Sequence, residues 1–197
     1  MTTPASLPKI AIVVGSNRRE SINRKLTQAL VKLAGSKEAK FVRIDDLPMF
    51  NQDLEANFPR EVAHYKDDIA GADGVLIVMP EHDRSIPAVL KNAIDWGARP
   101  YGKWPNKPAF ITGTSQGAIG TALAQQHLRS VTISLGMLLL GGEAYITFKP
   151  GLIDEQGNIG DESTQAFLQG FVDRFSTFVI RLTQHQQHNR EELAVRH

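Results

Sequence analysis

Short apolar runs alternate with longer segments of mixed polarity along most of this 197-residue chain. A run that is apolar at nearly every position is typical of a strand buried on both faces of a parallel sheet. The runs predict five strands: Lys9 to Val14, Phe41 to Ile44, Gly74 to Met79, Pro108 to Gly113, and one between Leu138 and Phe148, whose register Gly141 and Gly142 leave open.

The segments between these runs carry apolar residues at spacings of three and four, which predicts helices. Ser21 and Ser85 are candidate caps at two helix starts, and Gly35 and Gly71 are candidate stops. The polar stretch from Gln184 to His197 is expected to fray. The predicted helices run from Ser21 to Gly35, from Arg60 to Ala70, from Pro87 past Ile94, from about Gly120 to Ser134, and over Phe167 to Leu182.

This alternation predicts an α/β fold, in which helices cover both faces of a parallel sheet. Right-handed crossovers leave few arrangements for five strands, and the chain length suits a flavodoxin-like, doubly wound, three-layer αβα fold with strand order 2-1-3-4-5. A chain of this size buries enough surface for one full core. We therefore expect a single domain over residues 1–184, followed by a polar C-terminal tail over residues 185–197.

Composition and charge exclude several classes of function. The 22 Lys and Arg nearly balance the 21 Asp and Glu, so nothing favours nucleic acid or an anionic membrane as partner. The lack of cysteine excludes a disulfide scaffold and a cysteine nucleophile. No apolar run is long enough to span a membrane and residues 1–8 lack the features of a secretory signal, so we expect a cytoplasmic protein. His185 and His188 have no carboxylate between them, and we expect no metal site.

In a doubly wound sheet, ligands bind beyond the carboxyl ends of the strands, where the strand order reverses. The loop after the first strand opens a helix, so it directs backbone N–H groups and the positive helix end towards one place. Its polar side chains include Ser16, Arg18, Ser21 and Asn23. This combination fits a phosphate monoester, although the loop carries neither a Walker motif nor the three-glycine dinucleotide fingerprint. The alternative is that Ser21 only caps the helix and that the arginines are solvated.

The loops after the third and fourth strands suit a flat ligand. Between Pro80 and Pro87, a rigid turn presents backbone N–H and C=O groups at fixed spacing, which suits the edge of a planar heterocycle. From Gly113 to Gly120, the glycines let the backbone approach a flat ring closely. Each loop alone also fits an ordinary turn without a ligand, and Trp96 fits core packing better than a ligand contact.

Together, the three loops resemble those of the NADPH-dependent FMN reductase family, and within it the chromate and quinone reductase group. The resemblance covers about residues 9–148 and rests on three motifs in the same order. One departure is that the family's Tyr-Asn pair is His82-Asp83 here. The matching residues are Gly15, Ser16, Arg18, Ser21, Asn23 and Leu26 in the first motif, Pro80, Glu81, Ser85, Pro87 and Leu90 to Trp96 in the second, and His127-Leu128-Arg129 after the third loop.

The resemblance implies an oxidoreductase that passes two electrons from NADPH or NADH through bound FMN to a small-molecule acceptor, such as a quinone, a flavin, an azo compound or chromate. His82 is the candidate proton donor, because an imidazole titrates near neutral pH. Asp83 near the flavin N1 would disfavour the anionic reduced ring. The implied cofactor-binding residues are Gly15, Ser16, Arg18, Ser21, Ile22 and Asn23 at the phosphate, Pro80, Glu81, His82, Asp83 and Ser85 at one edge of the ring, and Ser115, Gln116 and Gly117 at its other side.

Two other functions share these features. An FMN-binding electron carrier without NAD(P)H turnover of its own would have this fold, but such carriers tend to be acidic, and this chain has a net charge of +1. A nucleotide-binding regulatory module could use the same phosphate loop, but it would not need the turn at Pro80.

The resemblance also implies a homodimer or a homotetramer, because members of the family assemble with the flavin near a subunit boundary. The loop from Arg99 to Trp104 combines two aromatic and two cationic residues with a proline. This composition fits an interface as well as it fits an ordinary surface loop.

Overall fold

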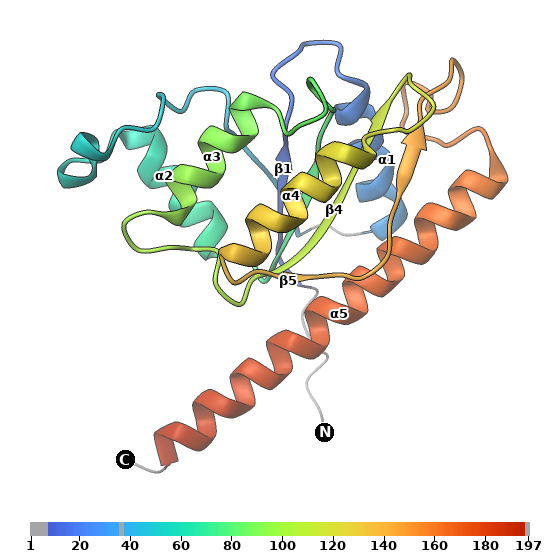
Figure 1. Ribbon diagram of the computed structural model, residues 1–197. Helices are drawn as coiled ribbons and strands as arrows, with labels where there is room; N and C mark the ends of the chain where they lie inside the picture. The colour runs from blue at the N-terminus through green and yellow to red at the C-terminus, as the bar shows by residue number, and fades with distance from the viewer. Residues whose placement is uncertain (1–7, 36–37, 196–197) are drawn as a thin grey trace.

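The computed structural model describes residues 8–35 and 38–195, which form a parallel sheet with helices on both faces (Figure 1). The order β2-β1-β3-β4-β5 confirms the predicted order 2-1-3-4-5. In the centre of the sheet, Ile10 of β1 pairs with Ala39 of β2 on one side and with Gly74 of β3 on the other. The strands are β1 (Ile10–Val14), β2 (Ala39–Val42), β3 (Gly74–Val78), β4 (Pro108–Ser115), β5 (Leu138–Leu139) and β6 (Tyr145–Thr147).

Alternate residues of the strands face the two helical layers. On β1, Ala11 and Val13 pack against one layer, which contains α2, α3 and α4, whereas Ile12 and Val14 pack against α1 and α5. This arrangement confirms the three-layer αβα fold. The helices are α1 (Ile22–Ala34), α2 (Arg60–Ala70), α3 (Ala88–Ala98), α4 (Ala122–Ser134) and α5 (Glu162–Val195), with a short 3-10 helix, η1 (Gln52–Ala56), before α2.

The predicted ends of α1 are confirmed, but the predicted cap of α3 is wrong. Ser21 Oγ accepts a hydrogen bond from the Arg24 N–H at 3.3 Å, and Gly35 closes α1 in the left-handed conformation, with φ 57°. The helix α3 begins later, after Pro87, with no side-chain cap. Proline has no N–H to satisfy and a φ suited to a helix start, so Ser85 is not needed as a cap there.

Two strands of the sheet differ from the prediction. The single strand expected between Leu138 and Phe148 is divided into β5 and β6, both of which pair with β4. Gly142 lies between them with φ 95°, a conformation that interrupts an extended run. The second strand is displaced from the predicted Phe41 to Ile44, because Ala39–Val42 are the residues that pair with β1.

The last helix is longer than predicted. It continues to Val195, past Gln184 where fraying was expected, because this segment contains no glycine or proline and is rich in Gln and Glu, which favour helix. In Figure 1, its C-terminal turns extend past the sheet and the other helices. Among the described residues, no helix combines the length and the apolar character needed to cross a bilayer.

Candidate functional site

The loops after β1, β3 and β4 lie at one edge of the sheet, where the three neighbouring parallel strands end (Figure 1). The first of these loops begins with two hydrogen bonds of 2.8 Å, from the Gly15 N–H to Val78 O and from the Ser16 N–H to Val14 O. After them, the N–H groups of residues 17–20 and 22–23 donate to no acceptor within the described parts of the chain. These groups, at the positive end of α1, are available to an anion.

The predicted phosphate-binding side chains differ in their exposure and in their hydrogen bonds to the rest of the protein. Ser16 is half-buried and Arg18 is exposed, and neither side chain has a partner in the part of the chain that the structure describes. Ser21 is buried and caps α1, so both the structural and the ligand-binding interpretation of its hydroxyl still apply. Ile22 is the first residue of the helix.

The side chain of Asn23 has a structural task that the sequence does not reveal. It is 1% exposed, its Nδ2 donates to Thr114 O at 2.9 Å, and its Oδ1 accepts from the Thr114 N–H at 2.9 Å. The amide therefore fastens α1 to β4. Of Asn23, only the backbone N–H is left for a phosphate.

The loop after β3 forms a tight turn at the predicted ring-binding position. The His82 N–H donates to Ser85 O at 3.0 Å and the Ser85 N–H donates to His82 O at 2.8 Å, so the two residues pair as at the end of a hairpin. The central residues Asp83 and Arg84 have φ of 48° and 64°. Positive φ at both central positions is the signature of a type I′ turn, and without glycine it costs about 1 to 2 kcal/mol per residue. The N–H groups of Asp83 and Arg84 have no acceptor within the described ranges, so they are free for a ligand.

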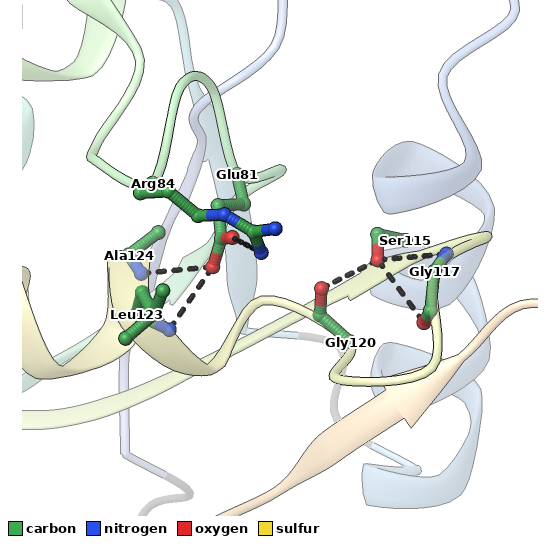
Figure 2. Close-up of polar contacts among 7 residues, drawn as sticks. All are labelled: Glu81, Arg84, Ser115, Gly117, Gly120, Leu123 and Ala124. Atoms are coloured by element: carbon green, nitrogen blue, oxygen red, sulfur yellow. Dashed lines mark hydrogen bonds and ion pairs between the residues drawn. The ribbon is translucent and has the colours of Figure 1, made fainter.

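Glu81 anchors this turn to α4 (Figure 2). Its Oε2 accepts from the N–H groups of Leu123 and Ala124, at 3.0 and 3.1 Å, and its Oε1 lies 3.2 Å from Arg84 Nη1. The carboxylate side chain is only 8% exposed. A carboxylate at a helix N-terminus is stabilised by the helix dipole and by the free N–H groups, so Glu81 holds this turn against the start of α4.

In the loop after β4, the hydroxyl of Ser115 determines the local shape. Ser115 Oγ accepts from the Gly117 N–H at 3.2 Å and donates to Gly120 O (Figure 2). Gly120 has φ 59° and lies so close to β6 that a Cβ there would be 3.0 Å from Ile146 N. Gln116 and Gly117, which were also predicted to face the ring, are exposed at the tip of this loop.

Two glycines allow the ends of the central strands to approach one another. A Cβ on Gly113 would lie 1.9 Å from Met79 O, and a Cβ on Gly15 would lie 2.9 Å from Met79 Cβ. Real Cβ atoms do not approach neighbouring atoms this closely. The loops after β1, β3 and β4 are therefore drawn together beneath the site.

Two histidines lie at this site in different environments. His82 is exposed on the turn, and its ring has no hydrogen-bond partner among the described residues. His127, on α4, has its Nδ1 2.7 Å from Ser85 Oγ. The sequence placed His127 in a family motif without a role, because nothing local indicates that α4 contacts the turn. Trp96 is fully buried and donates to Pro48 O at 2.8 Å, which confirms that it packs in the core.

Comparison with known proteins identifies this set of loops. Residues 8–150 match the family model described as NADPH-dependent FMN reductase. The chain is 49% identical over 175 residues to a 2-hydroxy-1,4-benzoquinone reductase from a Burkholderia species, covering 87% of this chain and 96% of the relative. It is 46% identical over 175 residues to a quinone reductase from Pseudomonas putida, covering 86% of this chain and 94% of that protein.

A solved structure agrees with these relatives. The flavoenzyme NAD(P)H:(acceptor) oxidoreductase FerB from Paracoccus denitrificans superposes with a TM-score of 0.85 and 43% sequence identity, covering 88% of this chain and 98% of FerB. The fold, the three loops and the matched range of residues agree with one another. The chain belongs to the NADPH-dependent FMN reductase family.

Proposed function

We propose that this protein is an FMN-dependent oxidoreductase that uses NADPH or NADH to reduce quinones and related small acceptors. The observation that carries the proposal is the set of N–H groups at residues 17–20 and 22–23 that no described residue accepts from, placed beside a turn in which the N–H groups of Asp83 and Arg84 are likewise without a described acceptor. One end of this site suits a phosphate and the other suits the polar edge of a flavin.

The residues present fit FMN. The free N–H groups and the Arg18 guanidinium would hold its phosphate, with Ser16, Ser21 and the backbone of Gly15, Ile22 and Asn23 around it. The backbone from Pro80 to Ser85 would meet one edge of the ring, and the loop with Ser115, Gln116 and Gly117 would close the other side. When bound, FMN supplies the chemistry, because it accepts a hydride from a nicotinamide and passes the electrons to an acceptor.

His82 is the proposed source of a proton for the acceptor. Its exposure and its lack of a hydrogen-bond partner among the described residues leave both ring nitrogens available. Asp83 follows it in the turn, so a negative charge would lie near the ring and would disfavour the anionic reduced form.

The proposed acceptors rest on the relatives, whose names specify 2-hydroxy-1,4-benzoquinone and quinones. The relatives do not decide between NADPH and NADH, since the name of FerB allows either donor. Flavins, azo compounds and chromate are secondary candidates for the same open ring face.

The test begins with a titration of the purified protein with FMN, in which binding is monitored by the loss of flavin fluorescence. The loaded protein is then mixed with NADPH under anaerobic conditions in a stopped-flow instrument, and menadione is added in a second experiment. Bleaching of the flavin by NADPH and its reoxidation by menadione are expected. No uptake of FMN would contradict the proposal, and FMN uptake without bleaching by NADPH or NADH would indicate an electron carrier.

We also propose that the protein is cytoplasmic and assembles as a homodimer or homotetramer. In the loop from Arg99 to Trp104, Tyr101 is 79% exposed while Trp104 is buried. On α4, Leu123 at the start of the helix, beside the Glu81 contact, and Ile133 near its other end are exposed apolar residues, which suits a subunit interface. Light scattering should give the mass of two or four chains, and a single-chain mass at micromolar concentration would contradict assembly.

A further inference from the structure

A hollow of about 250 Å³, which we call the β2 hollow, lies beside the first loop of the site. Ser16 of that loop lines it, together with Arg24 of α1 and Phe41, Arg43 and Asp45 of β2 and the segment after it. The strand β2 lies on the other side of β1 from β3. The β2 hollow is therefore separated from the ring-binding turn by the proposed phosphate-binding loop.

An aromatic side chain is exposed in this hollow. Phe41 is 43% exposed although it belongs to a strand of the sheet. It pairs in register with Ile12, which packs on the α1 side, and the alternation of strand residues places Arg43 on that same side. A phenyl ring next to guanidinium groups offers a stacking face for a flat, electron-rich base.

The two guanidinium groups in the hollow differ in their partners. Arg43 Nε lies 2.9 Å from Asp45 Oδ1 and 3.3 Å from Asp46 Oδ2, so its charge is compensated. The hydrogen bond from Arg43 lowers the pKa of Asp45, which keeps this carboxylate ionised. Arg24 is exposed, and its guanidinium has no hydrogen bond or ion pair within the described part of the chain, although its positive charge also helps to lower the pKa of Asp45. The hollow thus offers one guanidinium whose donors are not hydrogen-bonded to any described residue, and one ionised carboxylate.

We propose that the β2 hollow binds the adenosine end of the donor dinucleotide, an inference that rests on the function proposed above. The adenine stacks on Phe41, the Arg24 guanidinium pairs with the 2′-phosphate of NADPH, and Asp45 accepts a hydrogen bond from a ribose hydroxyl. Arginine suits a phosphate because its planar fork of donors matches the phosphate oxygens.

The spacing of the strands is compatible with this binding mode. Neighbouring strands lie about 4.8 Å apart, so β2 and β3 are separated by roughly 10 Å. An extended dinucleotide can cover this span, with its nicotinamide at the turn after β3 and its adenosine beside β2. Because Arg43 is already compensated by two aspartates, Arg24 alone would distinguish NADPH from NADH.

The experiment measures binding of adenosine fragments to the FMN-loaded protein by isothermal titration calorimetry. The probes are 2′,5′-ADP, which carries the 2′-phosphate, and 5′-AMP, which lacks it. Removing one charge-assisted pair in Arg24→Ala should weaken 2′,5′-ADP by roughly ten- to a hundredfold and leave 5′-AMP nearly unchanged. Phe41→Leu should weaken both probes to a similar extent, and the matched control Arg60→Ala, at an exposed arginine on α2, should change neither.

Steady-state kinetics supply a second measurement. Arg24→Ala should raise the KM for NADPH without raising the KM for NADH, while kcat stays the same. Equal effects on both donors, or no binding of 2′,5′-ADP to the wild type, would overturn the inference. A loss of FMN affinity in Arg24→Ala without a change in probe binding would also overturn it, because the hollow would then serve the FMN phosphate. If FMN binding and NADPH oxidation persist in the wild type, such a failure leaves the proposed function intact.

Discussion

The side-chain amide of Asn23 bonds both backbone polar groups of Thr114, with two hydrogen bonds of 2.9 Å. This pair connects the first turn of α1, where the phosphate is proposed to bind, with the end of β4, from which the third loop starts. The relative positions of these two loops therefore depend on one buried side chain.

Asn23→Ala should leave the N–H and the C=O of Thr114 buried without partners. Since each such group costs about 1 to 3 kcal/mol, the free energy of unfolding should fall by about 2 to 4 kcal/mol, and FMN affinity should fall as well. Urea unfolding and FMN titration measure the two effects. The control Gln28→Ala, at an exposed position of the same helix, should stay within about 0.5 kcal/mol of the wild type. An unfolding free energy for Asn23→Ala equal to that of the control would contradict this account.

Two replacements of Glu81 should separate the contribution of its negative charge to stability from the contribution of its hydrogen-bond acceptor. Glu81→Ala removes the acceptor for the Leu123 and Ala124 N–H groups and should cost about 1 to 2 kcal/mol. In Glu81→Gln an acceptor oxygen remains and only the favourable charge at the start of α4 is lost, so the cost should be about 0.5 kcal/mol. Thermal or urea unfolding measures the stability of each variant, and Glu81→Ala should be less stable than Glu81→Gln. If Arg84→Ala costs as much as Glu81→Ala, the ion pair with the exposed Arg84 and not the helix contact would be the anchor.

The proposed proton donor can be tested through the pH dependence of quinone reduction. His82→Phe should change the pH profile of kcat, because the variant removes the ring nitrogens that are proposed to supply the proton. His64→Gln, at an exposed histidine on α2, should keep the wild-type profile. If His82→Phe also keeps it, His82 has no part in proton transfer.

Lys66 on α2 makes stability depend on pH in the alkaline range. The side chain is buried, its Nζ donates to Trp96 O at 3.2 Å and also to Arg99 O, and burial lowers the pKa of Lys66 below its usual 10.5. Between the lowered value and 10.5, the unfolded chain binds a proton that the folded chain does not. This contribution therefore raises the free energy of unfolding as pH increases.

The check is urea unfolding of the wild type and of Lys66→Met between pH 7 and 10. The difference in unfolding free energy, wild type minus variant, should grow with pH. The exposed Lys149→Met serves as the control, and its difference from the wild type should stay flat. Parallel stability curves for the wild type and Lys66→Met would show that burial of this amine has no such effect.

Features encoded by neighbouring residues could be predicted from the sequence. The bond from Arg24 to Ser21 spans three positions, and Gly35 ends α1 through its own backbone conformation, so both are visible in a short stretch of chain. The strand order also followed, because handed crossovers limit the arrangements of a βα alternation. The three loops of the site came together as the topology requires.

The contacts that support the site could not be predicted in this way. Asn23 meets Thr114 across 91 positions and Glu81 meets Leu123 across 42, and many polar residues in the chain could satisfy the same groups. Short side chains such as Asn also suit a phosphate loop, so the ligand-binding interpretation was equally consistent with the sequence. The division between β5 and β6 depended on the conformation of Gly142, which a pattern of apolar residues does not encode.

The type I′ turn at Asp83 and Arg84 affects the thermodynamics of cofactor capture. The backbone pairing of His82 with Ser85 holds its two residues with positive φ, and the Glu81 carboxylate bonds the turn to the start of α4. A segment that is rigid before the ligand arrives loses little conformational entropy when the ligand binds. The turn could thus contact a flavin edge without first changing its conformation. Flavin binding should therefore show a small loss of conformational entropy and little structural rearrangement of the turn.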